Sequence, residues 1–407
     1  MTRTVDVVVV GAGPAGLTAA TRLRERGVAR VLVVERERVA GGVPRHCVHP
    51  GFGVRDLHRF LSGPRYAEEL VRRALAQGVE VSTSTTVIDV DARGVDITSA
   101  RGVERVDAQR VLVATGARER PRAARWIAGD RPAGVFTTGQ LQQWTYLERL
   151  PVGRRALVVG AEHVSFSAIM TLRHAGVKVV GLATELERHQ SVAGASLAAR
   201  YLAGAPVWHH SRVVDLEGRG RLSAVTLEDV RDGRQRRLAV DTVVFTGDWI
   251  PDHELVRRAG VEMDVGTRGP ASDEAGRTSV AGIYAAGNLL HPVESADVAA
   301  LGARVVADAL AAELARPLPA TRDVVRLTCD DPLSWVWPNR LLDGAPVDLL
   351  RLRTRTFTDA TRLQLLDDSH RLVVEGPIRR TTPHRSLLAA PAVVRAIGHG
   401  ARHVRLA

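Results

Sequence analysis

The sequence predicts an α/β protein that contains two β-α-β units and ends in a smaller module. In the first unit, Val5 to Glu35, a buried strand, a glycine turn, a helix and a second buried strand follow one another. The same order returns from Ala156 to Glu185. Such continuous apolar runs are typical of parallel strands that are covered on both faces. We therefore expect two Rossmann-like α/β domains, followed by a small α+β module.

The glycine turn of the first unit has the spacing that binds a dinucleotide. Gly11, Gly13 and Gly16 form the pattern G-x-G-x-x-G directly after the strand Val7 to Val10. The first glycine permits the tight turn, the second lets a pyrophosphate approach the backbone, and the third lets the helix pack closely on the strand. The start of the helix offers free N–H groups to the phosphates. Glu35 comes about twenty residues later, where an acid can bind ribose hydroxyls.

The second unit departs from this pattern at two of its three glycine positions. Gly160 begins the turn, but Glu162 and Ser165 occupy the next two positions, and the acid after the second strand is Glu185. The side chain of Glu162 would obstruct a pyrophosphate, and its carboxylate would repel the phosphate charges. We therefore expect this domain to bind NAD(P)H weakly or not at all.

Composition and charge favour a soluble enzyme. The 407 residues suffice for two or three domains, and no apolar run is long enough to span a bilayer. We do not interpret Arg3 to Ala20 as a signal peptide, because its removal would destroy the glycine turn. The two cysteines form no C-x-x-C pair and no metal-ligand spacing, so we expect a reducing cytoplasm and no metal. The net charge is +11 without a nucleic-acid motif. We interpret it as solvated arginine rather than a nucleic-acid surface, with an acidic protein partner as the alternative.

The rest of the chain predicts further short elements. We expect helices from Gly63 to about Gly78 and from about Asp297, and an antiparallel meander before the strand that ends at Ala114. In the C-terminal module we expect a hairpin with its turn at Asp367 to Ser369, and a core role for Trp335 and Trp337.

Four separated segments resemble the pyridine nucleotide-disulfide oxidoreductase superfamily, and within it the thioredoxin-reductase-like flavoproteins. They are GAGPAG with the later Glu35 and the pair Gly41-Gly42, then VLVATG, then VVFTGDWIPDHEL, then RTSVAGIYAAGN. The resemblance covers about residues 5 to 312. It implies an FAD domain split between 1–118 and 248–316, an inserted NAD(P)-type domain at 119–247, and a C-terminal module at 317–407.

The resemblance also implies which residues bind FAD. They are Gly11, Gly13, Pro14, Ala15, Gly16, Glu35, Arg36, Gly41, Gly42, Val87, Ala114, Thr115, Gly116, Gly287 and Asn288. Asn288 stands where the family usually has aspartate, and asparagine can still hydrogen-bond a ribityl hydroxyl or a phosphate. The redox-active cysteine pair of disulfide reductases is missing, as is the cysteine-rich [2Fe-2S]-binding tail of some relatives.

Four side chains are candidates for catalysis. Cys47 lies in the loop that should run beside the flavin, where a thiolate could form a charge-transfer contact or a sulfenic acid. The alternative for Cys47 is a buried small hydrophobe. His46 and His49 flank it as candidate bases or anion binders, or as structural residues. His291 begins the segment HPVESAD, whose side chains either line a substrate site or cap the next helix.

Two longer segments resemble particular groups of flavoproteins. GGVPRHCVHPGFG is similar to a loop of glycerol-3-phosphate-dehydrogenase-associated flavoproteins, and TTGQLQQWTYLERLPVGRRALVVGAEHVS to the large FAD subunits of opine oxidases, hydroxyproline dehydrogenases and hydrogen cyanide synthase. The resemblance implies a dehydrogenase subunit that oxidises a small amine, imino or hydroxy acid. Its electrons would pass to a partner, such as a small [2Fe-2S] protein and a second flavoprotein subunit. The alternatives are a self-contained NAD(P)H-dependent flavin oxidoreductase and a scaffold subunit whose flavin is not catalytic.

Overall fold

The chain folds into two compact units in the computed structural model, which describes residues 3–190, 204–316, 324–342, 347–383, 385–397 and 400–407. Unit 1 comprises Met1–Arg45, Pro50–Ala117 and Pro251–Ala407. Unit 2 comprises His46–His49 and Arg118–Ile250. This division differs in two respects from the three parts expected from the sequence. The C-terminal module belongs to unit 1, and the short segment around Cys47 belongs to unit 2.

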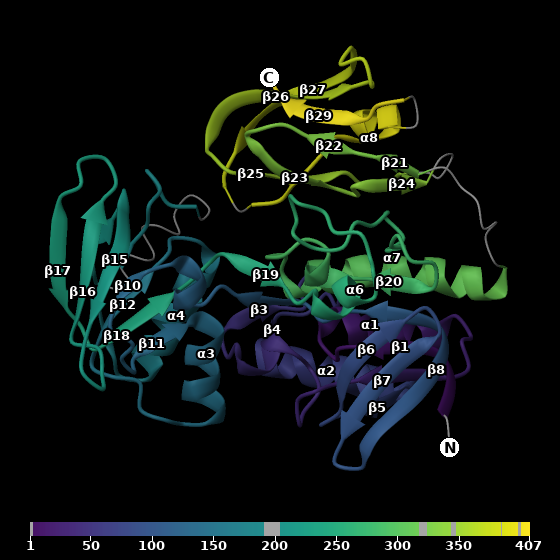
Figure 1. Ribbon diagram of the computed structural model, residues 1–407, viewed down its shortest axis with the longest axis horizontal. Coiled ribbons are helices and arrows are strands. Elements are labelled where there is room, and N and C mark those ends of the chain that lie inside the picture. Colours follow the sequence, from purple (N-terminus) through teal and green to yellow (C-terminus); the bar gives the residue numbers. More distant parts are fainter. Residues whose placement is uncertain (1–2, 191–203, 317–323, 343–346, 384, 398–399) are drawn as a thin grey trace. The chain divides into compact units, whose positions relative to one another are not determined.

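Unit 1 contains a seven-stranded sheet (Figure 1). Its strands are β1 (Arg3–Val10), β2 (Val31–Val34), β5 (Glu80–Ser82), β6 (Thr86–Asp91), β7 (Gly94–Ser99), β8 (Gly102–Val113) and β20 (Ile283–Ala285). β5, β2, β1, β8 and β20 pair in parallel, whereas β6, β7 and β8 form the predicted antiparallel meander. β1 and β2 pair from Val7↔Val31 to Val10↔Val34, and all the paired residues are buried. This burial on both faces of the sheet explains the uninterrupted hydrophobic runs of the two strands.

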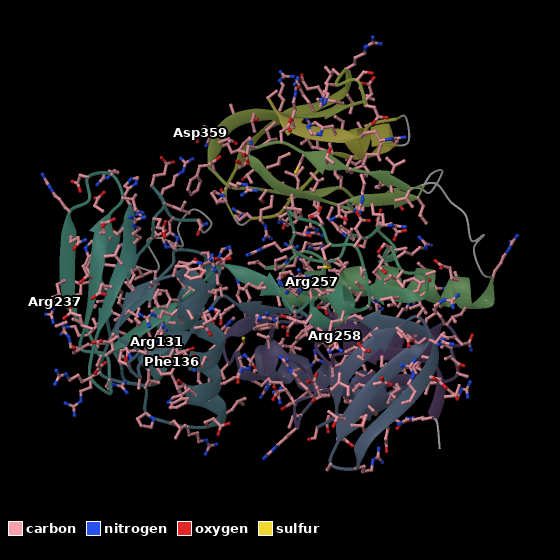
Figure 2. All side chains as sticks on the ribbon, viewed as in Figure 1. Arg131, Phe136, Arg237, Arg257, Arg258 and Asp359 are labelled. Carbon is pink, nitrogen blue, oxygen red and sulfur yellow. The ribbon has the colours of Figure 1, made fainter. Side chains whose placement is uncertain are left out.

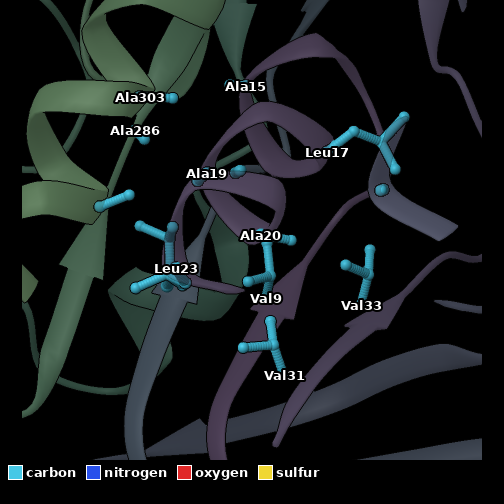
Figure 3. Packing of buried hydrophobic residues seen from close by; sticks show 14 of the residues in the cluster. Val9, Ala15, Leu17, Ala19, Ala20, Leu23, Val31, Val33, Ala286 and Ala303 are labelled. Carbon is cyan, nitrogen blue, oxygen red and sulfur yellow. The ribbon is translucent and has the colours of Figure 1, made fainter. Parts of the chain in front are cut away.

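Helices α1 (Pro14–Glu25) and α7 (Ala296–Ala315) pack on one face of this sheet. Leu17 and Leu23 of α1 join Val9 of β1 and Ala303 of α7 in one buried cluster (Figure 3). The remaining elements of this part are the helices α2 (Gly63–Ala76) and α6 (Glu254–Arg258), the single turns η1 (Val43–His46) and η4 (Gly287–Leu289), and the strands β3 (Pro50–Phe52) and β4 (Leu61–Ser62).

The C-terminal part of unit 1 consists mainly of short strands. They are β21 (Val324–Arg326), β22 (Thr328–Cys329), β23 (Leu333–Trp337), β24 (Arg340–Leu342), β25 (Arg351–Thr354), β26 (Thr358–Leu366), β27 (Leu372–Thr381), β28 (Leu387–Leu388) and β29 (His403–Leu406), with the helix α8 (Pro391–Ala396). β26 and β27 form the predicted hairpin. Trp335 and Trp337 are buried in the cluster that contains Val8 and Val10 of β1, which confirms their core role.

The described residues of unit 2 form two larger sheets, besides a two-stranded pair at the unit boundary. The parallel sheet has the order β11 (Val135–Thr137), β18 (Thr242–Phe245), β12 (Arg155–Val159), β13 (Lys178–Ala183) and β14 (Val207–Trp208). The second sheet has the order β10 (Ala128–Gly129), β15 (Ser211–Glu217), β16 (Ala224–Asp229) and β17 (Gln235–Ala239). The helices are η2 (Arg122–Arg125), α3 (Thr138–Gln142), η3 (Gln143–Leu147) and α4 (His163–His174), and the strands β9 (Ala117–Glu119) and β19 (Trp249–Pro251) lie at the unit boundaries. The succession β12, α4, β13 is the second predicted β-α-β unit.

Arginine accounts for the positive charge of the surface. Figure 2 labels Arg237 on β17 and Arg258 on α6, whose side chains are 59% and 66% exposed. They pair with Glu217 at 2.9 Å and with Asp89 at 3.6 Å. Exposed pairs of this kind contribute little to stability, because solvent screens them. Within the described ranges, no helix is long and apolar enough to cross a membrane.

Candidate functional site

The turn between β1 and α1 has open space at its second glycine. Gly13 begins the helix without a side-chain cap, and a Cβ built on it would approach nothing closer than the Gly42 Cα, at 4.0 Å. A Cβ on Gly16 would collide with the carbonyl oxygen of Gly11, so that glycine is needed for helix packing. The free N–H groups at the start of α1 therefore face a space that a phosphate can enter.

Glu35, at the end of β2, holds the backbone of this turn. Its Oε2 accepts a hydrogen bond from the Ala12 N–H at 2.8 Å, and its Oε1 accepts one from the Glu37 N–H at 2.9 Å. The residue is buried, with 7% of its surface exposed. A carboxylate has about four lone-pair positions, so Glu35 keeps acceptor capacity for ribose hydroxyls.

The glycine pair after β2 lies against the same turn. Gly41 donates its N–H to the carbonyl oxygen of Ala12 at 2.8 Å. Gly42 has φ of +64°, and a Cβ on it would lie 2.8 Å from the Gly13 Cα. The two backbones can approach this closely because Gly42 lacks a side chain. The pair thus forms the second wall of the cradle above Gly13.

The other predicted cofactor residues fall into two groups: some lie beside Gly11, and the rest lie elsewhere in unit 1. A Cβ on Gly11 would come within 2.6 Å of the Ala114 carbonyl oxygen, which brings the segment Ala114 to Gly116 against the turn. Thr115 donates its hydroxyl to the carbonyl oxygen of Asp252 at 2.7 Å. Arg36 and Val87 differ from these: the Arg36 side chain is 67% exposed and 3.5 Å from Asp252, whereas Val87 is buried in β6. Pro14 and Ala15 lie in the first turn of α1.

Gly287 and Asn288 form the single turn η4 beside α1. A Cβ on Gly287 would lie 2.6 Å from the Ala15 Cβ, so the glycine allows close contact between η4 and α1. The amide of Asn288 donates to the Glu294 carbonyl oxygen at 3.1 Å and accepts from the Glu294 N–H at 2.9 Å. The structure therefore gives Asn288 a loop-closing role that the sequence did not reveal. Its contact with a cofactor stays a prediction.

The segment around Cys47 packs within unit 2. Cys47 is 8% exposed, and its thiol donates to the Gln142 Oε1 at 3.4 Å. Burial raises the pKa of the Cys47 thiol to about 12, and the Glu119 carboxylate adds to the increase. At neutral pH the thiol is protonated, which fits a buried small hydrophobe and is at odds with thiolate chemistry. His46 is buried as well, whereas His49 is partly exposed.

The His291 side chain is packed against aromatic residues and is buried away from solvent. Its ring centroid lies 5.5 Å from that of Trp335 and 4.9 Å from that of Trp337, and 7% of the residue is exposed. Burial lowers its pKa to about 4. A catalytic base must reach its substrate, so this position is at odds with the predicted catalytic role. Asp297, in the first turn of α7, accepts from the Val298 N–H at 3.1 Å, whereas Ser295, the N-cap residue, makes no side-chain capping hydrogen bond.

Sequence reasoning missed the ion cluster around Glu294. The Glu294 Oε2 lies 3.2 Å from the Arg351 Nη1, and its Oε1 lies 3.3 Å from the Arg353 Nη2 and also accepts from the Ser386 hydroxyl. Arg353 also donates to the Pro292 carbonyl oxygen at 2.8 Å. The alternation of Arg351, Leu352 and Arg353 in β25 indicates a strand but does not reveal that the arginines are buried partners.

Comparison with known proteins gives a family and a set of relatives. The model of the family described as pyridine nucleotide-disulphide oxidoreductase matches residues 5–303. An opine oxidase subunit of Rhizobium meliloti (strain 1021) is 28% identical over 365 residues, which is 83% of this chain and 77% of that protein. The alpha subunit of the sarcosine oxidase of Corynebacterium sp. (strain P-1) is 29% identical over 401 residues, 91% of this chain but only 39% of that protein.

Solved structures show the same fold. The thioredoxin reductase of T. acidophilum superimposes with a TM-score of 0.63 at 21% identity, covering 76% of this chain and 99% of that structure. The L-proline dehydrogenase from P. horikoshii superimposes with a TM-score of 0.57 at 21% identity, covering 78% of this chain and 57% of that structure.

This family implies FAD and NAD(P)H binding, and the turn between β1 and α1 fits FAD. Gly13 and Gly42 leave the space that a pyrophosphate requires, the start of α1 would bind its charge, and Glu35 would accept from ribose hydroxyls. When bound, FAD supplies a reversible hydride acceptor. The chain therefore belongs to the pyridine nucleotide-disulphide oxidoreductase family and is an FAD-dependent oxidoreductase.

Proposed function

We propose that this chain is a dehydrogenase subunit that oxidises a small amine, imino or hydroxy acid and passes the electrons to a partner protein. Two of the similar proteins are named as subunits of an opine oxidase and of a sarcosine oxidase. A structure with the same fold is named L-proline dehydrogenase. These names support a substrate whose oxidisable carbon carries nitrogen, which is the amine or imino acid of the proposal.

The single observation that carries the proposal is the state of the cysteines. Cys47 and Cys329 form no disulfide with each other, and they belong to different units of the fold. Burial raises the pKa of each thiol to about 12. Disulfide reduction needs a reactive thiolate and a neighbouring cysteine that completes the exchange. This chain has the fold of a disulfide reductase without those groups, so its electron donor or acceptor is of another class.

Oxidation of the proposed substrate is a balanced two-electron step. The carbon next to nitrogen or oxygen would give up a hydride, for which the FAD that Gly13, Gly42 and Glu35 would hold supplies the acceptor, and the nitrogen or oxygen would give up a proton to solvent or a base. The product is an imine or a carbonyl compound. The two electrons would then leave to the partner, for which we propose a small [2Fe-2S] protein or a second flavoprotein subunit, in a reducing cytoplasm. Each [2Fe-2S] cluster takes one electron, so two clusters are reduced for each substrate oxidised, whereas a second flavin takes both electrons.

The test is anaerobic flavin reduction in the FAD-loaded full chain. The panel contains L-proline, L-hydroxyproline, sarcosine, an opine and simple 2-hydroxy acids, with NADH and NADPH assayed separately. We expect one of the small acids to bleach the oxidised flavin within seconds and an added oxidised [2Fe-2S] protein to restore its colour. A Gly13→Val variant that lacks FAD serves as the control. It shows whether the acids reduce the [2Fe-2S] protein directly, without the flavin.

Two results would replace the proposal by its alternatives. Rapid bleaching by NADH or NADPH, with no response to the acids, would support the self-contained NAD(P)H-dependent flavin oxidoreductase, a class represented among the relatives by a ferredoxin–NADP reductase. A flavin that none of these compounds reduces would support the scaffold subunit.

A further inference from the structure

The second glycine turn, between β12 and α4, contains a carboxylate where the first turn has open space. Gly160, Ala161 and Glu162 follow β12 as Gly11, Ala12 and Gly13 follow β1. Glu162 is the residue that begins α4, just as Gly13 begins α1. The two turns therefore differ mainly in the side chain at the position where a pyrophosphate would approach.

The Glu162 side chain folds back over its own turn instead of extending into solvent. Its Oε2 accepts a hydrogen bond from the Ala161 N–H at 2.9 Å. A Cβ built on Gly160 would lie 2.8 Å from that Oε2, and a Cβ built on Gly247, in the turn after β18, would lie 3.1 Å from the Glu162 Oε1. The Oε1 atom itself is buried. The carboxylate thus occupies the space between two glycine turns at the ends of adjacent parallel strands.

The two turns use different acids for the same backbone amide. In the first turn, the Ala12 N–H is held by Glu35 from the end of β2, which leaves the space above Gly13 free. In the second turn, the corresponding Ala161 N–H is held by Glu162 from within the turn. Thr184 follows β13 as Glu35 follows β2, and its hydroxyl accepts from the Leu186 N–H as Glu35 accepts from the Glu37 N–H. This position therefore carries no carboxylate, and Glu185, one residue later, is exposed. The hydrogen bond to this amide therefore comes from a carboxylate that fills the pyrophosphate position.

Neighbouring residues keep the carboxyl group in place. Arg125 donates to the carbonyl oxygens of Thr246 at 3.3 Å and Gly247 at 2.7 Å, and so fixes the turn on the far side of Glu162. Burial raises the pKa of Glu162, while the Thr246 hydroxyl, the Ala161 N–H and Arg125 favour its ionised form. The obstruction does not depend on the ionisation state, because the volume of the side chain is the same in both.

We infer that Glu162 acts as an internal substitute for the pyrophosphate and closes the second dinucleotide turn, so that this domain does not bind NAD(P)H there. The family implies NAD(P)H binding, but the residues of this turn do not fit it. The inference concerns binding in unit 2 and does not rest on the proposed substrate of the flavin.

The test measures calorimetric binding of NAD⁺ and NADP⁺, which cannot reduce flavin, to the FAD-loaded full chain. We expect no saturable binding by the wild type. We expect none by Glu162→Gln, because the amide keeps the volume and its carbonyl oxygen can still accept from Ala161. The double variant Glu162→Gly with Ser165→Gly restores the G-x-G-x-x-G pattern, since the buried Ser165 stands at the third position. We expect it to gain at least about tenfold in affinity for one of the nucleotides.

Two outcomes would overturn the inference. One is micromolar binding by the wild type that a bulkier substitution in the turn, Ala161→Val, removes. The other is no gain in the double variant when its FAD content and circular dichroism match those of the wild type. If the double variant does not fold, Glu162→Ala removes the same carboxylate with a smaller change to the backbone. A folded Glu162→Ala variant with no gain would equally overturn the inference.

Discussion

Glu294 and Arg353 form a buried ion pair that connects the loop after η4 to strand β25 of the C-terminal part. The Glu294 Oε1 lies 3.3 Å from the Arg353 Nη2, and the two side chains are 7% and 5% exposed. The loop itself is closed by Asn288, whose amide binds the backbone of Glu294. The C-terminal part therefore contacts a segment that directly follows the predicted cofactor residues Gly287 and Asn288.

Glu294→Gln should destabilise unit 1. The substitution removes the negative charge and leaves the Arg351 and Arg353 guanidinium groups without it in a buried site, which typically costs about 3 kcal/mol. Urea denaturation of the FAD-saturated protein measures the change. Glu375→Gln, which removes the partner of Arg362 on an exposed strand, is the matched control and should have little effect. Equal stability of the two variants would contradict the role assigned to Glu294.

The buried state of His291 predicts that acid weakens unit 1. The pKa of His291 is lowered from 6.5 to about 4, so between these values the unfolded chain binds the proton and the folded chain does not. The free energy of unfolding should therefore fall as the pH falls from 6.5 toward 4, by up to about 3 kcal/mol from this group. His291→Gln cannot titrate, and its urea denaturation profile should be flatter over the same window. A variant profile that parallels the wild type would show that His291 does not cause the effect.

Gly13→Val should abolish FAD binding without unfolding the chain. The substitution places methyl groups in the pyrophosphate space, but a Cβ there meets no protein atom closer than 4.0 Å. Purified Gly13→Val should therefore be colourless and retain the circular dichroism of the wild type. Gly302→Val is the control, because a Cβ at this exposed position of α7 meets nothing within 4 Å. Full FAD occupancy in Gly13→Val would refute the assignment of the turn.

Neither cysteine should react in the folded protein. With the pKa of both thiols raised to about 12, iodoacetamide at a pH of about 8 should alkylate them only after unfolding in guanidinium chloride, because the thiolate is the reactive form. Mass spectrometry counts the modified residues. Cys47→Ser should keep normal FAD content, since serine can also donate to Gln142. Fast alkylation of folded Cys47 would restore it as a candidate for thiolate chemistry.

The sequence alone was sufficient for the features that depend on neighbouring residues. Gly11, Gly13, Gly16 and Glu35 lie within one β-α-β unit, and their roles follow from backbone sterics and helix geometry at that short range. That β1 and β2 are buried parallel strands followed from their uninterrupted apolar runs, because a strand covered on both faces has no polar side. The same reasoning identified the second unit and the unusual residue Glu162.

The tertiary structure alone decided the partners of residues that are distant in the chain. Glu294 binds Arg353, 59 residues away, and Cys47 binds Gln142, 95 residues away. Sequence reasoning treated His291 and Cys47 as candidate catalytic residues because of their position near the expected flavin. Both are buried by contacts with distant residues, which no local sequence pattern predicts. The direction of the Glu162 side chain is also a tertiary property. The sequence shows that residue 162 is a glutamate. The hydrogen bond that its carboxylate accepts from the Ala161 N–H depends on the space between two turns, which only the folded sheet brings together.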